Sequence, residues 1–186
     1  MSETKALSSS ESVTSELLNT GFLSDTILIC PDEREFHMHT FALYIHSAYF
    51  RKALTHDLKE TKSGRFELGD DSSTIQAVVD FMYTKQYSVA TDPDASAELL
   101  QLHISVCIAA EFYGVVSLAE YAERRFLDAF IDWQKIKEAL PDVVRTIYAK
   151  DCRSIEGIRN EVLKVTLDNM AELELHQNYW KLFDEV

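Results

Sequence analysis

The chain has 186 residues, 46% of them hydrophobic, which suits one globular domain, or one domain with an appendage. Its 31 acidic and 18 basic residues give a formal net charge of −13, which argues against nucleic-acid binding, because phosphate contacts require a basic surface. No apolar run approaches the roughly 18 residues of a membrane span, and the polar residues 1–11 lack a signal-peptide core, so we expect a flexible N-terminal arm, no membrane association, and a cytoplasmic and/or nuclear location.

The first half of the sequence predicts a helix, two strands and a second helix. A short helix is expected from about Ser12 to Asn19, with Gly21 placed to end it. The β-branched run at 26–30 predicts a strand, residues 31–32 a turn, and the alternating stretch 35–38 a second strand. From Phe41, apolar residues recur at helical spacing, with Leu43 and Ile45 among them.

Further along the chain, short strands again alternate with helices. A third strand is expected at 66–68 and a fourth at 86–89. Asp70 and Asp71 precede a helix that ends near Thr84, and capping of that helix explains the two carboxylates better than a catalytic pair does. Two apolar helices are predicted at 99–114 and 118–130.

The sequence beyond residue 130 remains helical in character. Pro141 suits a first helical turn, Ser154 suits a helix N-cap, and a last helix is expected at about 174–185. These helices carry apolar stripes that must pack against one another or against the preceding domain. The stripes contain Val143, Val144 and Ile147 in one helix and Ile158, Val162 and Val165 in the next.

The order of these motifs resembles the BTB/POZ domain. Asp25 lies before the first strand, His39 at the strand-to-helix junction, and a Ser-x-x-Phe pattern (Ser47, Phe50) in the helical segment that follows. The segment 109–115, Ala-Ala-Glu-Phe-Tyr-Gly-Val, is similar to the close of the family's penultimate helix. The resemblance covers about residues 13–130 and looks most like compact fungal members of the family.

The resemblance implies an α+β BTB/POZ fold, in which helices flank a small mixed sheet, followed by an α-helical extension. We therefore expect the arm at residues 1–11, the BTB/POZ domain at 12–130, and a C-terminal helical extension at 131–186 that is similar to the start of a BACK region. Asp25, His39, Ser47 and Phe50 are expected to be structural residues of this fold.

Two interaction sites follow from the same resemblance. In BTB adaptors that recruit cullin-3, a hydrophobic-x-Glu motif follows the Ser-x-x-Phe helix, and Leu58 and Glu60 occupy that place. The alternative is that Leu58 only packs under its loop. The family also forms homodimers through its first helix and neighbouring elements. The matching apolar residues here are Val13, Leu17, Leu18, Phe22 and Leu23.

No catalytic, cofactor-binding or metal-binding pattern is present in the sequence. It has no Gly-rich phosphate loop, no Gly-x-Ser-x-Gly elbow and no His-Glu-x-x-His. The pair His37-x-His39 would need further ligands to hold a metal, so a structural role for His39 is the better hypothesis. The three cysteines lack paired spacing and are expected to be buried, reduced thiols. We therefore predict that the protein is not an enzyme and needs no cofactor.

The favoured function is a dimeric adaptor that links a partner or substrate protein, not identified by the sequence, to a cullin-3 ubiquitin ligase. The alternative is an oligomerisation or transcription-regulatory scaffold with no ligase role. One departure from the family bears on this alternative: Thr40 stands where many BTB transcription factors have Lys or Arg. Asp25 must then cap a nearby backbone turn or pair with another base.

Overall fold

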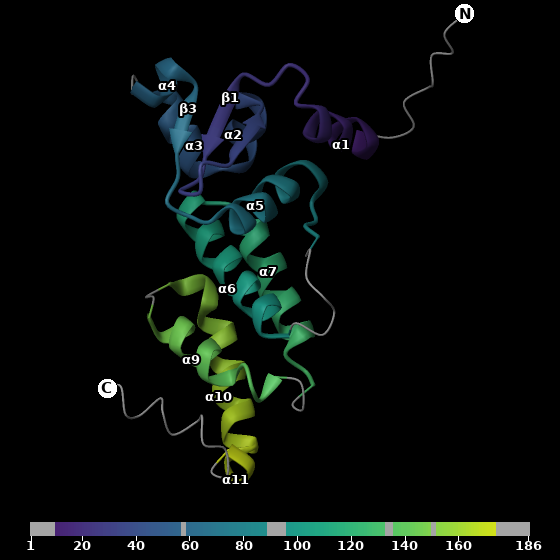
Figure 1. Cartoon of the computed structure of the whole chain (residues 1–186), viewed down its shortest axis with the longest axis vertical. Helices are drawn as coiled ribbons and strands as arrows, with labels where there is room; N and C mark the ends of the chain where they lie inside the picture. Colours follow the sequence, from purple (N-terminus) through teal and green to yellow (C-terminus); the bar gives the residue numbers. More distant parts are fainter. Residues whose placement is uncertain (1–9, 57–58, 89–95, 133–135, 150–151, 174–186) are drawn as a thin grey trace, which may run out of the picture. The chain divides into compact units, whose positions relative to one another are not determined.

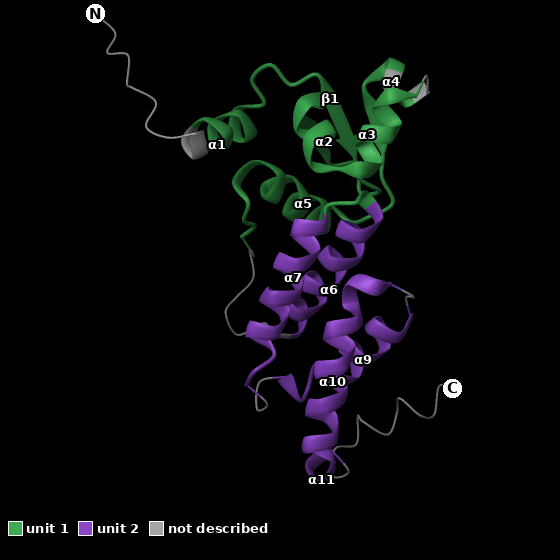
Figure 2. Cartoon of the chain, turned by 180° about the vertical axis from the view of Figure 1, so that it is seen from behind, with its two compact units in different colours: residues 1–88, 113–115 green, residues 89–112, 116–186 purple. Residues whose placement is uncertain are grey.

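The computed structural model describes residues 10–56, 59–88, 96–132, 136–149 and 152–173 (Figure 1). The chain divides into two compact units (Figure 2). Unit 1 contains residues 1–88 and 113–115, and unit 2 contains residues 89–112 and 116–186. None of the helices described within these ranges combines the length and hydropathy that crossing a membrane requires.

Unit 1 combines three short strands with five helices over its described residues, and so confirms the predicted α+β class. Its elements are α1 (Ser10–Thr20), β1 (Thr26–Ile29), β2 (Glu35–Met38), α2 (Thr40–His46), α3 (Ala48–Thr55), α4 (Lys59–Ser63), β3 (Arg65–Glu67) and α5 (Ser72–Thr84). The first helix ends as expected: Gly21 has φ +59°, and its N–H donates to the Leu17 carbonyl at 2.9 Å.

The sheet is small and mixed, with strand order β2-β1-β3. β1 runs antiparallel to β2 and parallel to β3, so Leu28 lies opposite both Phe36 and Phe66. These three side chains and Met38 are buried, whereas their neighbours along β2 and β3 are exposed. This alternation is the period-2 pattern of a sheet with one covered face.

Ser47 and Phe50, the residues of the Ser-x-x-Phe pattern, are both buried in the core. Ser47 is fully buried and caps α3: its hydroxyl accepts the Phe50 N–H at 3.0 Å and donates to the Tyr113 carbonyl at 2.6 Å. The Phe50 ring stacks on Tyr113, with centroids 5.5 Å apart. Gly114 is required here, because it has φ +66° and a Cβ would lie 2.7 Å from the Cβ of Ala48.

The helix α5 is buried along most of its length and begins at the capping carboxylate of Asp71. This carboxylate accepts the backbone N–H groups of Ser73 and Thr74, each at 3.0 Å, and their hydroxyls also donate to it. Burial acts to raise the Asp71 pKa, but these hydrogen bonds outweigh it and leave the pKa lowered. The preceding Asp70 has another role, since its carboxylate accepts the Tyr113 hydroxyl at 2.6 Å.

Every secondary-structure element described in unit 2 is a helix or a 3₁₀ turn. Its elements are α6 (Ser96–Tyr113, with Tyr113 itself in unit 1), α7 (Val116–Ala129), α9 (Leu140–Ala149), the 3₁₀ turn η1 (Arg153–Ile155), α10 (Glu156–Asp168) and α11 (Met170–Leu173). In the two predicted stripes Val143, Ile147, Ile158 and Val162 are buried, so the predicted packing of the helices beyond residue 130 is correct at these positions. The division of the chain at residue 130 remains a prediction.

Some local expectations were wrong. Residues 86–88 are irregular rather than a strand, and the remaining residue of that prediction, Val89, lies outside the described residues. Ser154 does not cap α10; its hydroxyl donates to the Cys107 carbonyl at 2.9 Å, and its N–H donates to Glu111 at 2.7 Å. The expected helix at 174–185 also lies outside the described residues.

The Asp71 cap gives a pH-dependent prediction. Asp71→Ala should lower the free energy of unfolding by about 1–2 kcal/mol at neutral pH, because two N–H groups lose their acceptor. The folded-state pKa of Asp71 is lowered, so its contribution exists above the unfolded-state pKa and is lost as the pH falls through the folded-state value. The difference between the two proteins in urea unfolding should therefore shrink at acid pH. Asp71→Asn, which keeps the acceptor without the charge, is the control, and a pH-independent cost for Asp71→Ala would contradict the account.

Candidate functional site

The segment between α1 and β1 is tied to the start of α2. The Asp25 carboxylate accepts the N–H of Thr40, the first residue of α2, at 2.6 Å. The Thr26 and Thr40 hydroxyls share a hydrogen bond of 2.6 Å. The antiparallel register pairs Thr26 with Met38 and so brings these positions together. Of the two roles left open for Asp25, the structure shows the backbone cap.

His39 links the same segment to α5. Its Nε2 lies 2.7 Å from the Phe22 carbonyl oxygen, and its Nδ1 lies 2.7 Å from the Tyr83 hydroxyl. A carbonyl only accepts, so Nε2 carries the proton and Nδ1 accepts from Tyr83. The His39 backbone N–H also donates to the Tyr83 oxygen at 3.1 Å, and burial raises the pKa of Tyr83. Both ring nitrogens of His39 are therefore engaged in hydrogen bonds.

Several large apolar side chains lie exposed around this junction, and we call them the α1–α2 face. Phe22 is 64% exposed, Leu23 is 74% exposed and Phe41 is 73% exposed. Tyr44 and Ile45 are also exposed and share the side of α2 with Phe41, because residues at i, i+3 and i+4 lie on one side of a helix. The complete face consists of Phe22, Leu23, Phe41, Tyr44 and Ile45.

The backbone at Leu23 is in an uncommon conformation. Leu23 has φ +63°, the left-handed region, which disfavours a leucine by roughly 1 kcal/mol. The turn is held on both sides: the Phe22 carbonyl is bonded to His39, and the Ser24 N–H donates to the Gly21 carbonyl at 3.0 Å. The fold therefore fixes Phe22 and Leu23 with their side chains toward solvent.

The helix α1 extends the α1–α2 face with an apolar hollow. The hollow has a volume of about 540 Å³ and is lined by Val13, Glu16, Leu17, Thr20 and Phe22. The four residues from α1 are spaced i, i+3, i+4 and i+7, so they share one side of the helix. Val13 and Leu17 are half-buried. Of the predicted dimer residues, these two and Phe22 therefore lie together, with Leu23 next to them.

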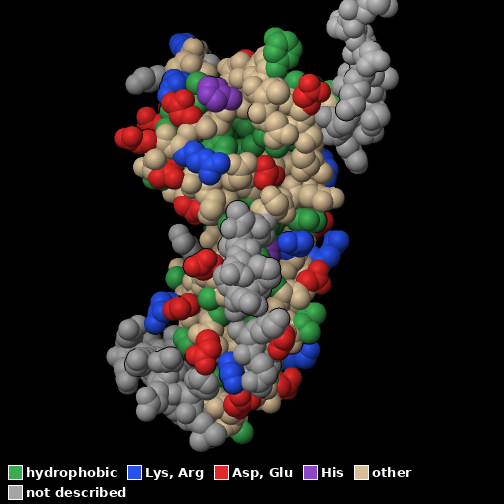
Figure 3. Space-filling view, turned by 45° about the vertical axis from the view of Figure 1, so that its right-hand side comes forward, with side chains coloured by type: hydrophobic (Ala, Val, Ile, Leu, Met, Phe, Trp, Pro, Cys, Tyr) green, Lys and Arg blue, Asp and Glu red, His purple; other side chains and the backbone are tan. Residues whose placement is uncertain are grey.

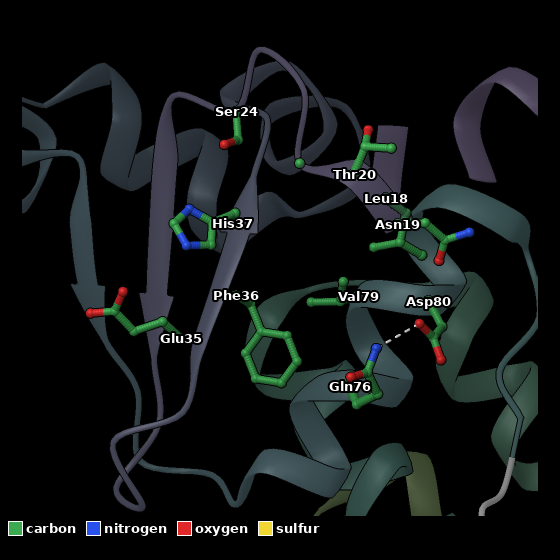
Figure 4. A pocket seen from close by; sticks show the side chains of 11 residues that line it. Leu18, Asn19, Thr20, Ser24, Glu35, Phe36, His37, Gln76, Val79 and Asp80 are labelled. Carbon is green, nitrogen blue, oxygen red and sulfur yellow. Dashed lines mark hydrogen bonds between the residues drawn. The ribbon is translucent and has the colours of Figure 1, made fainter. Parts of the chain in front are cut away.

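Leu18 lies at a different hollow, of about 500 Å³, between the end of α1, β2 and α5 (Figure 4). Phe36 and Val79 contribute apolar surface to it, and polar side chains surround them. The Gln76 amide donates to the Asp80 carboxylate at 2.8 Å, while burial raises the Asp80 pKa above its ordinary value. From the side of α1, hydrophobic side chains of unit 1 are seen recessed between charged ones (Figure 3).

The adaptor loop is only partly described. Glu60 is exposed in the first turn of α4, and Leu58 lies outside the described residues. Glu60 lines a hollow of about 480 Å³ together with Tyr49 and Ala53 of α3. Neither the proposed partner role of Glu60 nor that of Leu58 is tested by this geometry, and both remain predictions.

The apolar residues from Phe41 onward lie on two sides of α2 (Thr40–His46), not one. Leu43 is buried as a core residue should be, but Ile45 is exposed. Phe41 and Tyr44, which the sequence analysis did not assign to an interface, share the exposed side of α2. The spacing 41, 44, 45 was a usable signal, since it marks a second apolar side on the same helix.

No three described His, Cys, Asp or Glu residues are grouped so that they could hold a metal ion. The three cysteines are free and buried. Burial raises the pKa of Cys30 to about 11 and that of Cys107 still further, which keeps these thiols protonated and unreactive at neutral pH. What unit 1 offers is a protein surface: an apolar face on a rigid frame, with hollows beside it.

A fold and a site of this kind define a protein-interaction domain, and the family comparison agrees. The family model of the BTB/POZ domain matches residues 14–127, more than half of the chain. The chain therefore belongs to the BTB/POZ family, whose domains are interaction modules and not enzymes.

Solved structures were also compared with the chain. The BTB domain of zebrafish PATZ1 is similar to it, with 20% sequence identity and a TM-score of 0.46. The similarity covers 65% of this chain and 96% of that domain. The comparison with curated protein sequences gave no match.

The hydrogen bonds of Tyr83 can be tested by deleting one atom. Tyr83→Phe removes the partner of both the N–H and the Nδ1 of His39, and should cost about 1–2 kcal/mol of unfolding free energy. It should also speed amide hydrogen exchange at residues 22–25. Tyr148→Phe, at a 60% exposed tyrosine of unit 2, is the matched control and should cost little. Equal stability of the two variants would show that the Tyr83 hydroxyl does not hold the junction.

Proposed function

We propose that this protein is a homodimeric adaptor that joins a partner protein to a cullin-3 ubiquitin ligase. The observation that carries the dimer is the α1–α2 face together with the hollow along α1. Contiguous exposed apolar surface on a folded domain marks an interaction site, and two-fold homodimers are the commonest closed assembly. In a two-fold dimer the same patch of each copy forms the interface, so the α1–α2 face of one copy would pack against the α1–α2 face of the other.

The rigidity of the α1–α2 face supports its role as a dimer interface. Phe22 and Leu23 belong to a turn whose backbone is fixed by His39 and Gly21, and Phe41 follows a helix start capped by Asp25. An interface fixed before association loses less conformational entropy on binding than a mobile one. The hollow lined by Val13, Leu17 and Phe22 adds a concave, largely apolar region that a side chain of the second copy can fill.

The ligase role rests on the loop before β3. Glu60 is exposed, and its carboxylate forms no ion pair with any described residue. The exposed ring of Tyr49 lies beside it in the same hollow. An aromatic ring next to a carboxylate supplies an apolar anchor and a charge that fixes orientation. Leu58, two residues before Glu60, is the expected second anchor.

The rival function is a scaffold without a ligase role. Dimerisation through the α1–α2 face serves either function, so the cullin test separates them. The charged pocket of the corepressor type is disfavoured here, because Thr40 supplies no base and Asp25 is occupied by the Thr40 N–H. This observation supports the adaptor over a corepressor-binding scaffold.

The dimer predicts a specific response to charge. Phe22→Glu and Leu17→Glu should each shift the protein from about twice the 21.3 kDa of one chain toward monomer in sedimentation equilibrium. Removing one buried aromatic or leucine side chain from an interface costs about 2 kcal/mol per copy. Ile131→Glu, at a 78% exposed position of unit 2, should leave the mass unchanged. A wild-type mass of one chain at micromolar concentration would refute the dimer.

The ligase role predicts binding that depends on Leu58 and Glu60. Leu58→Asp should weaken binding to the N-terminal domain of cullin-3 by at least ~2 kcal/mol in calorimetry, as expected for an interface hot spot. Glu60→Gln should weaken it less. The melting temperature serves as the folding control. Absence of cullin-3 binding by the wild-type protein, with the dimer intact, would leave the scaffold as the function.

A further inference from the structure

The strand β3 lies at one edge of the described sheet, beside β1 and next to α4 (Figure 1). β1 occupies one side of β3, and no described strand occupies the other. An uncovered strand edge presents backbone N–H and C=O groups that can pair with another extended chain.

The hydrogen bonds to β1 determine the outward groups. The Gly64 carbonyl accepts the Ile27 N–H, and the Leu68 N–H donates to the Ile29 carbonyl, each at 2.8 Å. In a parallel pair alternate residues point to the same neighbour, so Arg65 and Glu67 direct their backbone groups away from β1. The Arg65 N–H donates to the Ser63 hydroxyl at 3.3 Å. The outward groups still open to a partner are the Arg65 carbonyl and the N–H and carbonyl of Glu67.

A hollow of about 480 Å³ runs along this edge. All three residues of β3 line it, although Arg65 and Glu67 point to the opposite face of the sheet from Phe66. A hollow that touches both faces of a strand lies beside its edge. The helices α3 and α4 form the rest of the wall on the outer side, with Tyr49 and Ala53 from one and Glu60 and Ser63 from the other. Ile29 of β1, which is paired with Glu67, also lines the hollow, so it extends from the edge onto the face of the sheet.

The charge of the hollow selects its occupant. Arg65 is paired with Glu35, so its positive charge is already balanced. The carboxylates of Glu60 and Glu67 have no ion pair among the described residues, and the whole chain carries −13. A basic side chain would place its charge between these carboxylates and its stem against the Tyr49 ring. An acidic segment would be repelled.

We propose that the edge of β3 and its hollow bind an extended segment of a partner protein that carries basic side chains, by adding a strand to the sheet. Main-chain hydrogen bonds to Arg65 and Glu67 supply the alignment, and alternate side chains enter the hollow. This site shares Glu60 with the proposed cullin loop but depends neither on Leu58 nor on cullin-3. It gives the adaptor a second surface, separate in sequence from the α1–α2 face, on which a substrate segment can be held.

The test uses a fluorescent heptapeptide of alternating valine and arginine, measured by anisotropy against the full chain. Two control peptides separate the contributions: a valine–glutamate peptide removes the basic charge, and a version N-methylated at alternate residues cannot pair along one edge. The valine–arginine peptide should bind at least tenfold more tightly than either control. The Glu67 amide should shift in the ¹⁵N NMR spectrum. Equal binding of the three peptides, or no binding at millimolar concentration, would overturn the proposal.

Variants at Glu67 distinguish main-chain pairing from charge alone. Glu67→Gln removes the carboxylate and should weaken peptide binding a few-fold. Glu67→Pro also removes the outward N–H, at an edge position where proline is tolerated, and should weaken binding at least tenfold further. Equal affinities of the two variants would contradict strand addition; if Glu67→Pro does not fold, the N-methylated peptide decides the same point. Leu58→Asp should leave peptide binding unchanged, so loss of the cullin role and loss of this site are distinguishable.

A second copy of the chain is the competing occupant of the same edge. If β3 edges pair between copies, Glu67→Pro should reduce the mass in sedimentation while Leu17→Glu does not. That result would show that the β3 edge binds a second copy of the chain and not a partner segment, and it would overturn the proposal. A mass that responds to Leu17→Glu and not to Glu67→Pro supports it.

Discussion

The junction of His39 with Tyr83 and Phe22 is the interaction on which the functional surface of unit 1 depends. One imidazole ring connects three segments: the turn after α1, the end of β2 and the helix α5. Asp25, the residue before β1, adds a second connection by capping α2. Leu23 has φ +63° and Phe22 is exposed, so without these hydrogen bonds neither residue would be held in one conformation.

This arrangement explains why the apolar residues of the α1–α2 face are exposed to solvent, although the domain has an ordinary buried core. The buried face of the sheet takes Leu28, Phe36 and Phe66, and Phe50 stacks on Tyr113 beneath them. The side of α2 with Phe41 and Tyr44 points away from that core, and the turn at Phe22 is held next to it. The polar network therefore positions the apolar surface, and the proposed dimer accounts for its exposure, because association would bury apolar area that one chain alone leaves in water.

Much of the fold could be predicted because its signals are local. Alternation predicted β2, and the Asp71 carboxylate predicted the start of α5. The cap that Ser47 supplies and the burial of Phe50 came only from the structure. The candidate site was harder to predict from the sequence, because its side chains are held by partners distant in the chain. No sequence signal near Ser154 predicts that its backbone N–H donates to the carboxylate of Glu111, 43 residues earlier in the chain. Likewise, the sequence does not tell that Leu17 and Leu18 line different hollows. That difference depends on where β2 and α5 lie relative to α1.

The central claim is that a preformed α1–α2 face closes against a second copy. Amide hydrogen–deuterium exchange, followed over a hundredfold range of protein concentration, tests it most directly. The account predicts that exchange at residues 21–26 and 40–46 slows as concentration rises, while exchange in α10 stays constant. Exchange at these residues that is independent of concentration, in a protein whose mass shows a dimer, would place the interface elsewhere and contradict the account.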